Sequence, residues 1–435
     1  MRRVRFPCLS EAHSVQSERK GGDFGDTRGG PRDGRVSKGT SMRDHEGRLV
    51  SAGFTRRRAL ELGAAAAVGT AVTALGAGAA SADDDADKSK GFKVDPSWPK
   101  PLPGKWITAE VAGNAVDAKD HVWALTRSRA TPEQFTDKER RMVREGRAQR
   151  SPTVIEFDQS GEVVNSWNLS GTPPDNMHGI FVDYQGYVWV GGNGGNDSIV
   201  QKYDRRGTLQ RQIGVQHNRD LTNHSPTLLN RPSDIFVDPA NGEVYISDGY
   251  GNRRVIVFGP GNANNTALRM WGEQGTVADA EAGAPYRFLE VVHAVNIGAD
   301  GLVYVNDRKG DRIHVYTKAG AFVRNIWIQK GVGWRNDAAH MAAGDGAAIG
   351  TAWDAAFSAD KHQTFIYNAD GEQELNWTIR RGEDQATSPF GRGGHQAGES
   401  TYLHTIAVDS NGDLYAAETI GGRRIQKFKA TGEHK

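Results

Sequence analysis

Short apolar runs separated by polar turns dominate residues 231–258 and set the pattern for most of the chain. β-Branched and aromatic residues bounded by Asp, Asn and Gly are typical of strands joined by tight turns. The pattern predicts three consecutive strands, at Ser233–Val237, Val244–Ser247 and Arg254–Phe258, with turns at Asn241-Gly242 and Gly249–Asn252.

The same pattern occurs six times, in copies that begin at Val111, Met177, Arg231, Val292, Trp353 and Leu403. Aligned on one position of the first strand, the copies place in one register Ala112, His178, Ser233, His293, Asp354 and His404. These positions are roughly 50 to 66 residues apart, and a repeat of this kind, built from about four short strands, is typical of a β-propeller. We therefore predict an all-β fold, a six-bladed β-propeller over residues 91–435.

Three of the six aligned positions are histidines, and they fall in alternate copies. Alternate blades of a closed six-fold ring lie about 120° apart, so His178, His293 and His404 are expected to point at one spot on the axis. Three imidazoles with an open fourth position form the ligand set of a catalytic zinc site. Zinc is favoured over iron, cobalt or copper by its availability and tetrahedral preference. The remaining histidines singled out by the sequence have no partner at this register and are predicted to be surface or loop residues: His217, His224, His340 and His395.

A second set of candidate residues follows the second strand of three copies. Arg127 and Arg308 share one register, three blades apart and hence across the axis, while Gly249 holds that register in the third copy and Tyr250 comes next. Arginine suits bidentate recognition of a carboxylate, and a tyrosine beside a metal and a cation is suited to act as a base. The alternative is that these are ordinary loop residues. Asp238 and Asp409 repeat with the blades and are predicted to be turn residues rather than general acids.

Composition and charge exclude several classes of function. The formal net charge of +1 gives no reason to expect nucleic acid or an acidic membrane surface as a partner. The single cysteine, Cys8, precedes the predicted cleavage site, so the mature chain would have neither a disulfide nor a thiolate metal site. Any metal must then be held by nitrogen and oxygen ligands.

The N-terminal part of the sequence indicates that the protein is exported. Residues 1–41 are interpreted as disordered or as an extension ahead of a start at Met42. Residues 42–82 combine paired arginines, a weakly apolar run and an Ala80-Ser81-Ala82 site, the pattern of a twin-arginine signal peptide. Residues 83–90 form a charged linker. We expect a mature protein that begins at Asp83, lies outside the cell or in the periplasm or cell envelope, and has no stable membrane association once the signal is cleaved.

Three further features concern the ends and loops of the repeat array. The last copy supplies only three evident strands, so its fourth is expected from the N-terminal side, around Phe92–Val94, which would close the ring. An insertion at Ala130–Arg150, with a charged helix near Phe135–Glu145, is interpreted as a solvated excursion rather than a substrate lid. The irregular loop Gly331–Gly350 has no assigned role.

At these residues the chain resembles a known family. The segments SDGYGNRRVIVF and NDR, and the histidines before IFVD and IAVD, are similar to the peptidyl-α-hydroxyglycine α-amidating lyases, which belong to the wider NHL-repeat propellers; the similarity runs from about Gly91 to Lys429. The resemblance implies a six-bladed propeller with an axial zinc on His178, His293 and His404. It also implies a functional tyrosine at Tyr250 and two functional arginines at Arg127 and Arg308.

The chain departs from the family beside the third histidine. The family has an acidic residue that serves a structural calcium where this chain has Thr405, which puts that calcium in doubt, and a methionine where this chain has Tyr402. The activity implied is cleavage of an α-hydroxyglycine-type carbinolamide to an amide and glyoxylate.

The predicted partner is therefore a small-molecule or peptide substrate with a C-terminal carboxylate, bound by a monomer. Tyr250 would remove the hydroxyl proton, and Arg127 and Arg308 would hold the carboxylate. The first alternative is a non-catalytic NHL-repeat propeller that binds a protein or glycan partner. The second is a lactonase-like hydrolase, although propeller lactonases coordinate calcium through carboxylates and Asn, which this axial set lacks.

Overall fold

The computed structural model describes residues 91–129, 134–261, 265–334 and 348–432. The predictions for residues 1–41, 42–82 and 83–90, and for His340, lie outside the described residues. Within the described part of the chain, no helix has the length and apolar character needed to cross a membrane.

Six four-stranded antiparallel sheets make up the fold, as the repeat predicted. From the inner to the outer strand, blades 1 to 3 are β3 (Val111–Val116), β4 (Val122–Thr126), β6 (Val154–Phe157) and β7 (Val163–Trp167); β8 (Met177–Val182), β9 (Val188–Gly192), β10 (Ile199–Tyr203) and β11 (Leu209–Gly214); and β12 (Asp234–Val237), β13 (Val244–Asp248), β14 (Arg254–Phe258) and β15 (Arg269–Trp271). Blades 4 to 6 are β18 (Val292–Ile297), β19 (Leu302–Asp307), β20 (Arg312–Thr317) and β21 (Phe322–Trp327); β22 (Asp354–Phe357), β23 (Phe365–Asp370), β24 (Leu375–Arg380) and β25 (Ser388–Phe390); and β26 (Leu403–Val408), β27 (Leu414–Glu418), β28 (Arg424–Ala430) and β1 (Phe92–Asp95).

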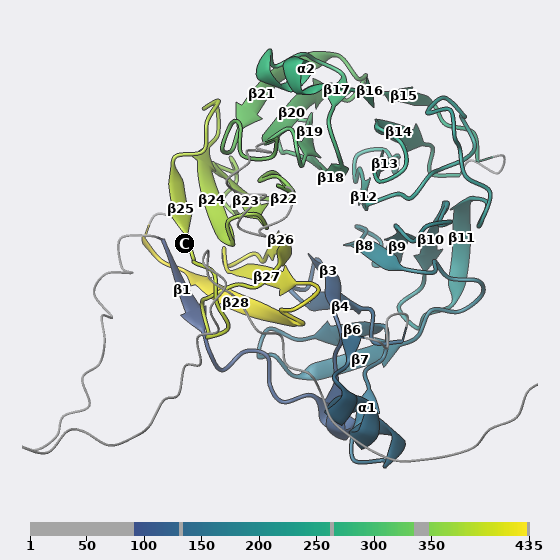
Figure 1. Cartoon of the computed structure of the whole chain (residues 1–435), viewed down its shortest axis with the longest axis vertical. Helices are drawn as coiled ribbons and strands as arrows, with labels where there is room; N and C mark the ends of the chain where they lie inside the picture. Colours follow the sequence, from purple (N-terminus) through teal and green to yellow (C-terminus); the bar gives the residue numbers. More distant parts are fainter. Residues whose placement is uncertain (1–90, 130–133, 262–264, 335–347, 433–435) are drawn as a thin grey trace, which may run out of the picture. The chain divides into compact units, whose positions relative to one another are not determined.

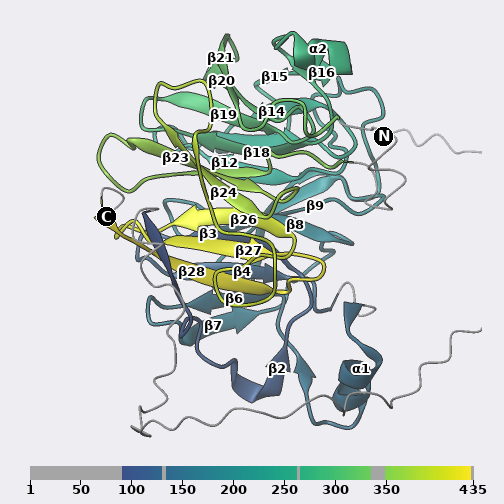
Figure 2. The same ribbon diagram turned by 60° about the vertical axis from the view of Figure 1, so that its left-hand side comes forward.

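The inner strands pack against one another in blade order, and β26 packs back on β3, so the six blades form a closed ring around one axis (Figure 1). Figure 2 shows β26, β27 and β28 of blade 6, in yellow, beside β3 and β4 of blade 1, in blue. The six-bladed propeller is confirmed. Because the ring is closed at the axis, residues at one height on different inner strands face a common centre.

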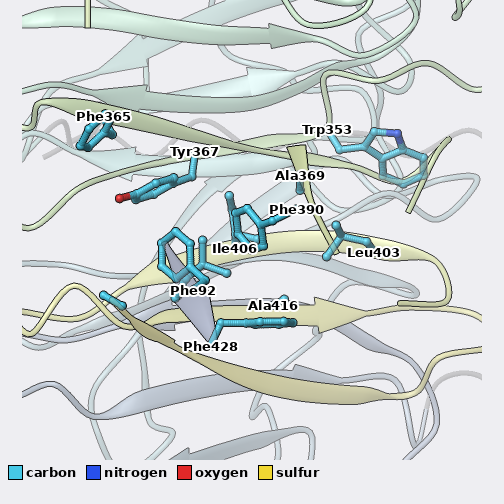
Figure 3. Packing of buried hydrophobic residues seen from close by; sticks show 12 residues of the cluster. Phe92, Trp353, Phe365, Tyr367, Ala369, Phe390, Leu403, Ile406, Ala416 and Phe428 are labelled. Atoms are coloured by element: carbon cyan, nitrogen blue, oxygen red, sulfur yellow. The ribbon is translucent and has the colours of Figure 1, made fainter. Parts of the chain in front are cut away.

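The predicted closing strand is present. β1 pairs with β28 in an antiparallel ladder that runs from Phe92 opposite Ala430 to Asp95 opposite Lys427. Phe92 is 2% exposed and belongs to the core cluster between blades 5 and 6, where its ring stacks on Phe390 at 4.7 Å (Figure 3). The last blade is thus completed from the N-terminal side of the described chain, which covers an otherwise unpaired sheet edge.

Buried acid–arginine pairs fix the loops that leave the second strands. Asp248 pairs with Arg254 at 3.0 Å, and Asp307 pairs with Arg312 at 3.1 Å; all four side chains are fully buried. In blade 6, Glu418 pairs with Arg424 at 2.7 Å. Asp248 directly precedes Gly249 and Asp307 directly precedes Arg308, the positions at the register of the second candidate set. Breaking such a buried pair leaves an uncompensated charge, so these loops are held in one conformation.

Smaller elements decorate the ring. They are the one-turn helix η1 (Pro103–Lys105), the helices α1 (Asp137–Arg144) and α2 (Val277–Glu281), and the two-stranded parallel pairs β2 (Trp106–Ile107) with β5 (Gln149–Arg150) and β16 (Glu273–Gln274) with β17 (Arg287–Phe288). The helix predicted in the blade 1 insertion is therefore present as α1. Arg423 of blade 6 donates to Glu139 of α1 through both terminal nitrogens, at 2.9 and 3.1 Å, which anchors the insertion to the neighbouring blade.

Candidate metal centre and active site

The three predicted histidines meet on the axis. His178 lies on β8, His293 on β18 and His404 on β26, and each is at most 2% exposed. Their ring centroids are 4.7 to 5.0 Å apart, and one nitrogen from each lies within 4.8 Å of the others. The structure thus brings together the side chains that the alternating register predicted. Their role as metal ligands stays a prediction.

A β-bulge at each histidine sets the direction of its side chain. The ladders of β8, β18 and β26 with their neighbours shift register at this point, so that the histidine is an extra residue in the inner strand. β3 carries the same irregularity at Ala112. Bulges of this kind re-aim a side chain and are frequent beside active sites.

The repeat alignment is wrong by one residue in blade 5. The ladders of β12 and β22 have no bulge: Asp234 lies opposite Ser247, and Asp354 lies opposite Ala369. Asp354 therefore corresponds to Asp234 rather than to the histidines, and Trp353 takes the place that Ser233 has in blade 3. The shift arises at the turn of blade 5, where Ser358 takes the place that Asp238 has in blade 3: the N–H of Ser358 donates to the Phe365 carbonyl as that of Asp238 donates to the Glu243 carbonyl. Counted back from Ser358, the residue at the histidine register is Trp353.

Backbone carbonyls of the next blade orient the imidazoles. Nδ1 of His178 lies 2.8 Å from the Ser233 carbonyl, and Nδ1 of His293 lies 2.7 Å from that of Trp353. A carbonyl only accepts, so each Nδ1 carries the proton and each Nε2 presents a lone pair toward the axis. Nδ1 of His404 has no partner in hydrogen-bond geometry among the described residues, although the backbone of Ala112 favours its charged form.

These lone pairs fit a metal ion. Nε2 of His293 is buried and has no hydrogen-bond partner in the described part of the chain. Burial lowers the pKa of His178 and His293 well below the ordinary value, with the neighbouring imidazoles adding to the effect, and burial together with Arg127 and Arg308 lowers the pKa of His404 to about 3. All three rings are therefore neutral near pH 7, the form that binds zinc.

Tyr250 reaches this centre from the loop after β13. Its hydroxyl oxygen lies 3.0 Å from Nε2 of His178 and accepts from Nη1 of Arg308 at 3.2 Å. The preceding Gly249 makes this approach possible, because a Cβ there would collide with the Val292 carbonyl of blade 4. The hydroxyl thus lies between the His178 imidazole and the Arg308 guanidinium.

The two arginines differ in how their charges are compensated. Arg308 is 9% exposed, stacks on the Trp353 ring with its guanidinium carbon 4.8 Å from the centroid, and has no carboxylate partner among the described residues; its Nε is buried without a hydrogen bond. Arg127 forms a buried ion pair with Glu110 and donates from Nε to the Met177 carbonyl at 2.6 Å.

Sequence reasoning missed Glu110 and Trp353. Neither stands at a repeat register that the alignment had marked as functional, because Glu110 precedes the first strand of blade 1 and Trp353 lies in the most divergent copy. Only the fold shows that they contact the two arginines.

A cavity of about 680 Å³ opens over the centre. Its lining includes Arg127, His178, Tyr250, Arg308, Trp353 and His404. The volume falls in the range of about 300–1,000 Å³ that is usual for small-ligand sites. Two of the three histidines, the tyrosine and both arginines thus share one cavity.

On the other side of the histidines lies a smaller cavity of about 210 Å³ that Asp234 and Asp354 line. Burial raises the pKa of both carboxyls, that of Asp354 to about 7. Their oxygens accept backbone N–H groups of the next blade, from Val295 at 3.1 Å and from Ile406 at 2.9 Å. The hydroxyl of Thr405 likewise accepts from the backbone of Asn114 at 3.2 Å. This layer therefore links neighbouring inner strands.

The other histidines singled out by the sequence lie away from the axis. His217, His224 and His395 are exposed. A second cluster that the sequence did not reveal joins Asp117, His121 and Glu156, and Arg205 forms ion pairs with both carboxylates. Because an arginine already balances this cluster, it gives no indication of a metal.

Comparison with known proteins points to one class of propeller. No family model matches the chain. The chain is 27% identical over 301 residues to NHL repeat-containing protein 3 of Mus musculus. The match covers 65% of this chain and 74% of that protein. The Homo sapiens counterpart is 26% identical over the same shares. These similarities and the six blades support an NHL-repeat propeller.

Part of the propeller is also similar to larger enzymes. Peptidyl-glycine alpha-amidating monooxygenase B of Xenopus laevis is 26% identical over 235 residues, which are 51% of this chain and 24% of that protein. The match thus spans about a quarter of the larger protein. Among solved structures, a streptogramin B lyase superimposes with a TM-score of 0.47 at 13% identity, over 78% of this chain and 98% of that one.

Proposed function

We propose that this propeller is a metal-dependent lyase that cleaves α-hydroxyglycine-type carbinolamides to an amide and glyoxylate. The observation that carries the proposal is the contact of the Tyr250 hydroxyl with both His178 and Arg308, directly beside three converging neutral imidazoles. The partial similarity to peptidylglycine amidating enzymes adds support.

His178, His293 and His404 would hold the metal, and zinc is the ion that their donor set suits best. When bound, zinc would act as a Lewis acid toward the oxygens of the substrate. The buried carbonyls of Ser233 and Trp353 keep the rings of His178 and His293 oriented for that role.

Arg308 is the residue that we assign to the substrate carboxylate. Its guanidinium lines the cavity with no carboxylate partner in the described chain, so a carboxylate bound there would balance a buried positive charge. Arg127 lines the same cavity, but Glu110 already balances it. We therefore propose that Arg127 shapes the cavity and makes its electrostatic potential more positive, and that it contributes less than Arg308 to holding the carboxylate.

Tyr250 moves the proton. Its oxygen takes the proton of the substrate hydroxyl, the O–H electrons form the aldehyde C=O of glyoxylate, and the C–N bond breaks with its electrons on the amide nitrogen. The amide nitrogen then gains one proton. One proton leaves the substrate hydroxyl and one is added to the amide product, so the step is balanced. Arg308, which donates to the Tyr250 oxygen, stabilises that oxygen while it is deprotonated.

A binding function is the second candidate, because the relatives matched over the larger share of their length are NHL repeat-containing proteins. In that case the metal would be structural and four-coordinate, and the cavity would hold a group of a protein or glycan partner. A structural site is closed to substrate, whereas a catalytic site keeps an open position.

Glyoxylate release tests the proposal. The protein is stripped with a chelator, reloaded with zinc, and incubated with an N-acyl-α-hydroxyglycine, and glyoxylate is followed by its hydrazone. We expect about one zinc per chain and release well above the spontaneous rate only from the reloaded protein. Full metal loading without any release above background from such substrates contradicts the lyase and favours the binding function.

A further inference from the structure

One part of the cavity wall is anionic and apolar. Blade 5 contributes Glu372 and Glu374 from the loop after β23, and Ile349, Tyr402 and Ile420 also line the cavity. Tyr402 and Ile420 are among the more exposed large apolar residues of the described chain, at 37% and 47%. The cavity is therefore polarised: guanidinium groups on the histidine side, and carboxylates among apolar groups at this wall.

The two carboxylates have different tasks. Both oxygens of Glu374 accept backbone N–H groups, from Tyr402 at 2.6 Å and from Leu403 at 2.8 Å, so this side chain holds the strand entry of blade 6. In Glu372 only Oε2 is used, by Ile349 at 2.5 Å and Gly350 at 3.2 Å. Among the described residues, Oε1 of Glu372 has no hydrogen-bond donor, and no Lys or Arg forms an ion pair with this carboxylate.

Glu372 is close to the carboxylate-binding arginine. Its partner Gly350 packs directly on the Arg308 carbonyl, where a Cβ would collide with that oxygen. One backbone segment thus joins the anionic wall to Arg308, and both side chains line the same cavity. A single small ligand can therefore contact both charges.

Tyr402 is held in place by strained backbone. Its φ of 55° lies in the left-handed region, which a bulky residue rarely adopts. The conformation is fixed because Glu374 accepts its N–H and its carbonyl accepts from Thr419 at 2.9 Å. Strain of this kind clusters at ligand sites. Tyr402 thus lines the same cavity as two carboxylates, and an aromatic residue together with carboxylates is suited to attract a cation.

We propose that the cavity selects carbinolamides whose acyl group carries a cation near the scissile amide, such as a basic side chain, with Glu372 as its anionic contact and Tyr402 as its aromatic face. The inference rests on the lyase function and adds the substrate class. The carboxylate of such a substrate lies at Arg308 while its cationic group lies at the wall of Glu372.

Binding and turnover are measured separately to test the inference. The probes are N-acetyl-lysyl-glycine, N-acetyl-norleucyl-glycine and N-acetyl-glutamyl-glycine, which lack the reactive hydroxyl, titrated into the zinc-loaded protein by calorimetry. We expect the lysyl probe to bind about fivefold tighter than the norleucyl probe, and the glutamyl probe to bind weakest, since a partly exposed ion pair contributes up to about 1 kcal/mol. The preference should shrink at high salt.

Variants assign the preference to its residues. Glu372→Gln keeps an oxygen acceptor for Ile349 and Gly350 but loses the charge, and should bring the lysyl and norleucyl affinities to near equality. Tyr402→Leu should reduce the same ratio about twofold or more. Glu162→Gln, an exposed carboxylate in a turn of blade 1, is the matched control and should leave the ratio unchanged.

Equal binding of the lysyl and norleucyl probes to the parent protein, or an unchanged ratio in Glu372→Gln, overturns the inference. The α-hydroxyglycine forms of the same three compounds separate this outcome from failure of the lyase function. Glyoxylate release at equal kcat/KM for all three would leave the lyase standing and refute the selectivity. A binding preference without glyoxylate release would support the selectivity of the cavity and refute the lyase function.

Discussion

Replacing Tyr250 by Phe removes one oxygen that bonds two groups of the site, at 3.0 Å to His178 and 3.2 Å to Arg308. The ring keeps its packing, with its centroid 4.9 Å from that of His178 and 6.0 Å from that of His293. In the zinc-loaded protein the Nε2 lone pair of His178 is used by the metal, so the substitution removes mainly the hydrogen bond from Arg308, which costs about 1–2 kcal/mol of stability. The fold and the bound zinc should therefore survive.

The effect on the reaction should be much larger. A positioned base contributes typically about 10²–10⁴-fold, which corresponds to about 3–5 kcal/mol of the barrier. Because the proton moves only in the transition state, kcat and kcat/KM should fall by the same factor while KM stays near its parent value. The assay is steady-state glyoxylate release, with zinc content and thermal unfolding measured on the same preparations.

Tyr245 provides the matched control for this substitution. It lies on β13 of the same blade, and its hydroxyl also bonds two groups: Glu243 at 3.2 Å and Arg269 at 2.6 Å. Tyr245→Phe should cost comparable stability and leave turnover unchanged. Parent-like turnover in Tyr250→Phe would refute the role of the hydroxyl. An equal loss in both variants would show that the effect comes from the fold of the blade.

Three further predictions concern the metal, the ring closure and pH. His293→Ala should lose most of its zinc, measured by atomic emission after dialysis, whereas the exposed His217→Ala should keep it; equal zinc in both would rule out the shared centre. Phe92→Ala should lower the free energy of unfolding by about 3–5 kcal/mol in denaturant titrations, because it empties a core position of the closing strand; a change below about 1 kcal/mol would contradict that role. Burial lowers the pKa of His314 to about 4, below that of an unfolded histidine, so stability should fall as pH drops from about 6.5 toward 4. His314→Gln should weaken that dependence by up to about 3 kcal/mol over this range, and an unchanged pH profile would count against it.

Much of the fold was predictable because the signal repeats. Strand periodicity and turn residues are local properties, and six copies of a weak local pattern reinforce one another. The closing strand at Phe92 followed from a count of strands in the last copy, since a sheet edge without a partner is unfavourable. The predictions for residues 1–90 depend on a different kind of pattern and stay predictions.

The site was predictable only as far as its residues share a register. His178, His293 and His404 do, as do Arg127 and Arg308. The structure brings the three imidazoles together on the axis, and both arginines line the larger cavity with His178 and His404. The ion pair of Arg127 with Glu110 was not predictable, because no repeat relates those two positions. The pairing removes most of the reason to treat the two arginines as equivalent, and it makes Arg308 the stronger candidate for the substrate carboxylate.

The alternation of the histidines has a counterpart in the backbone of the odd blades. Blades 2, 4 and 6 carry a bulge that turns His178, His293 and His404 toward the axis. Each of these rings then needs an acceptor for Nδ1–H. The neighbouring odd blade supplies a backbone carbonyl at the corresponding height, from Ser233 for His178 and from Trp353 for His293.

For His404 the neighbouring odd blade is blade 1, where the backbone of Ala112 favours the charged form of the imidazole. If all six blades carried an inward histidine, six imidazoles would compete for one point on the axis. The odd blades avoid this crowding because each contributes backbone groups rather than an imidazole at this height. In blades 3 and 5 the next residue of the inner strand is an aspartate. Asp234 and Asp354 each accept a backbone N–H group of the following blade and so link adjacent inner strands. The irregular copies in the sequence are therefore part of the site rather than degraded repeats.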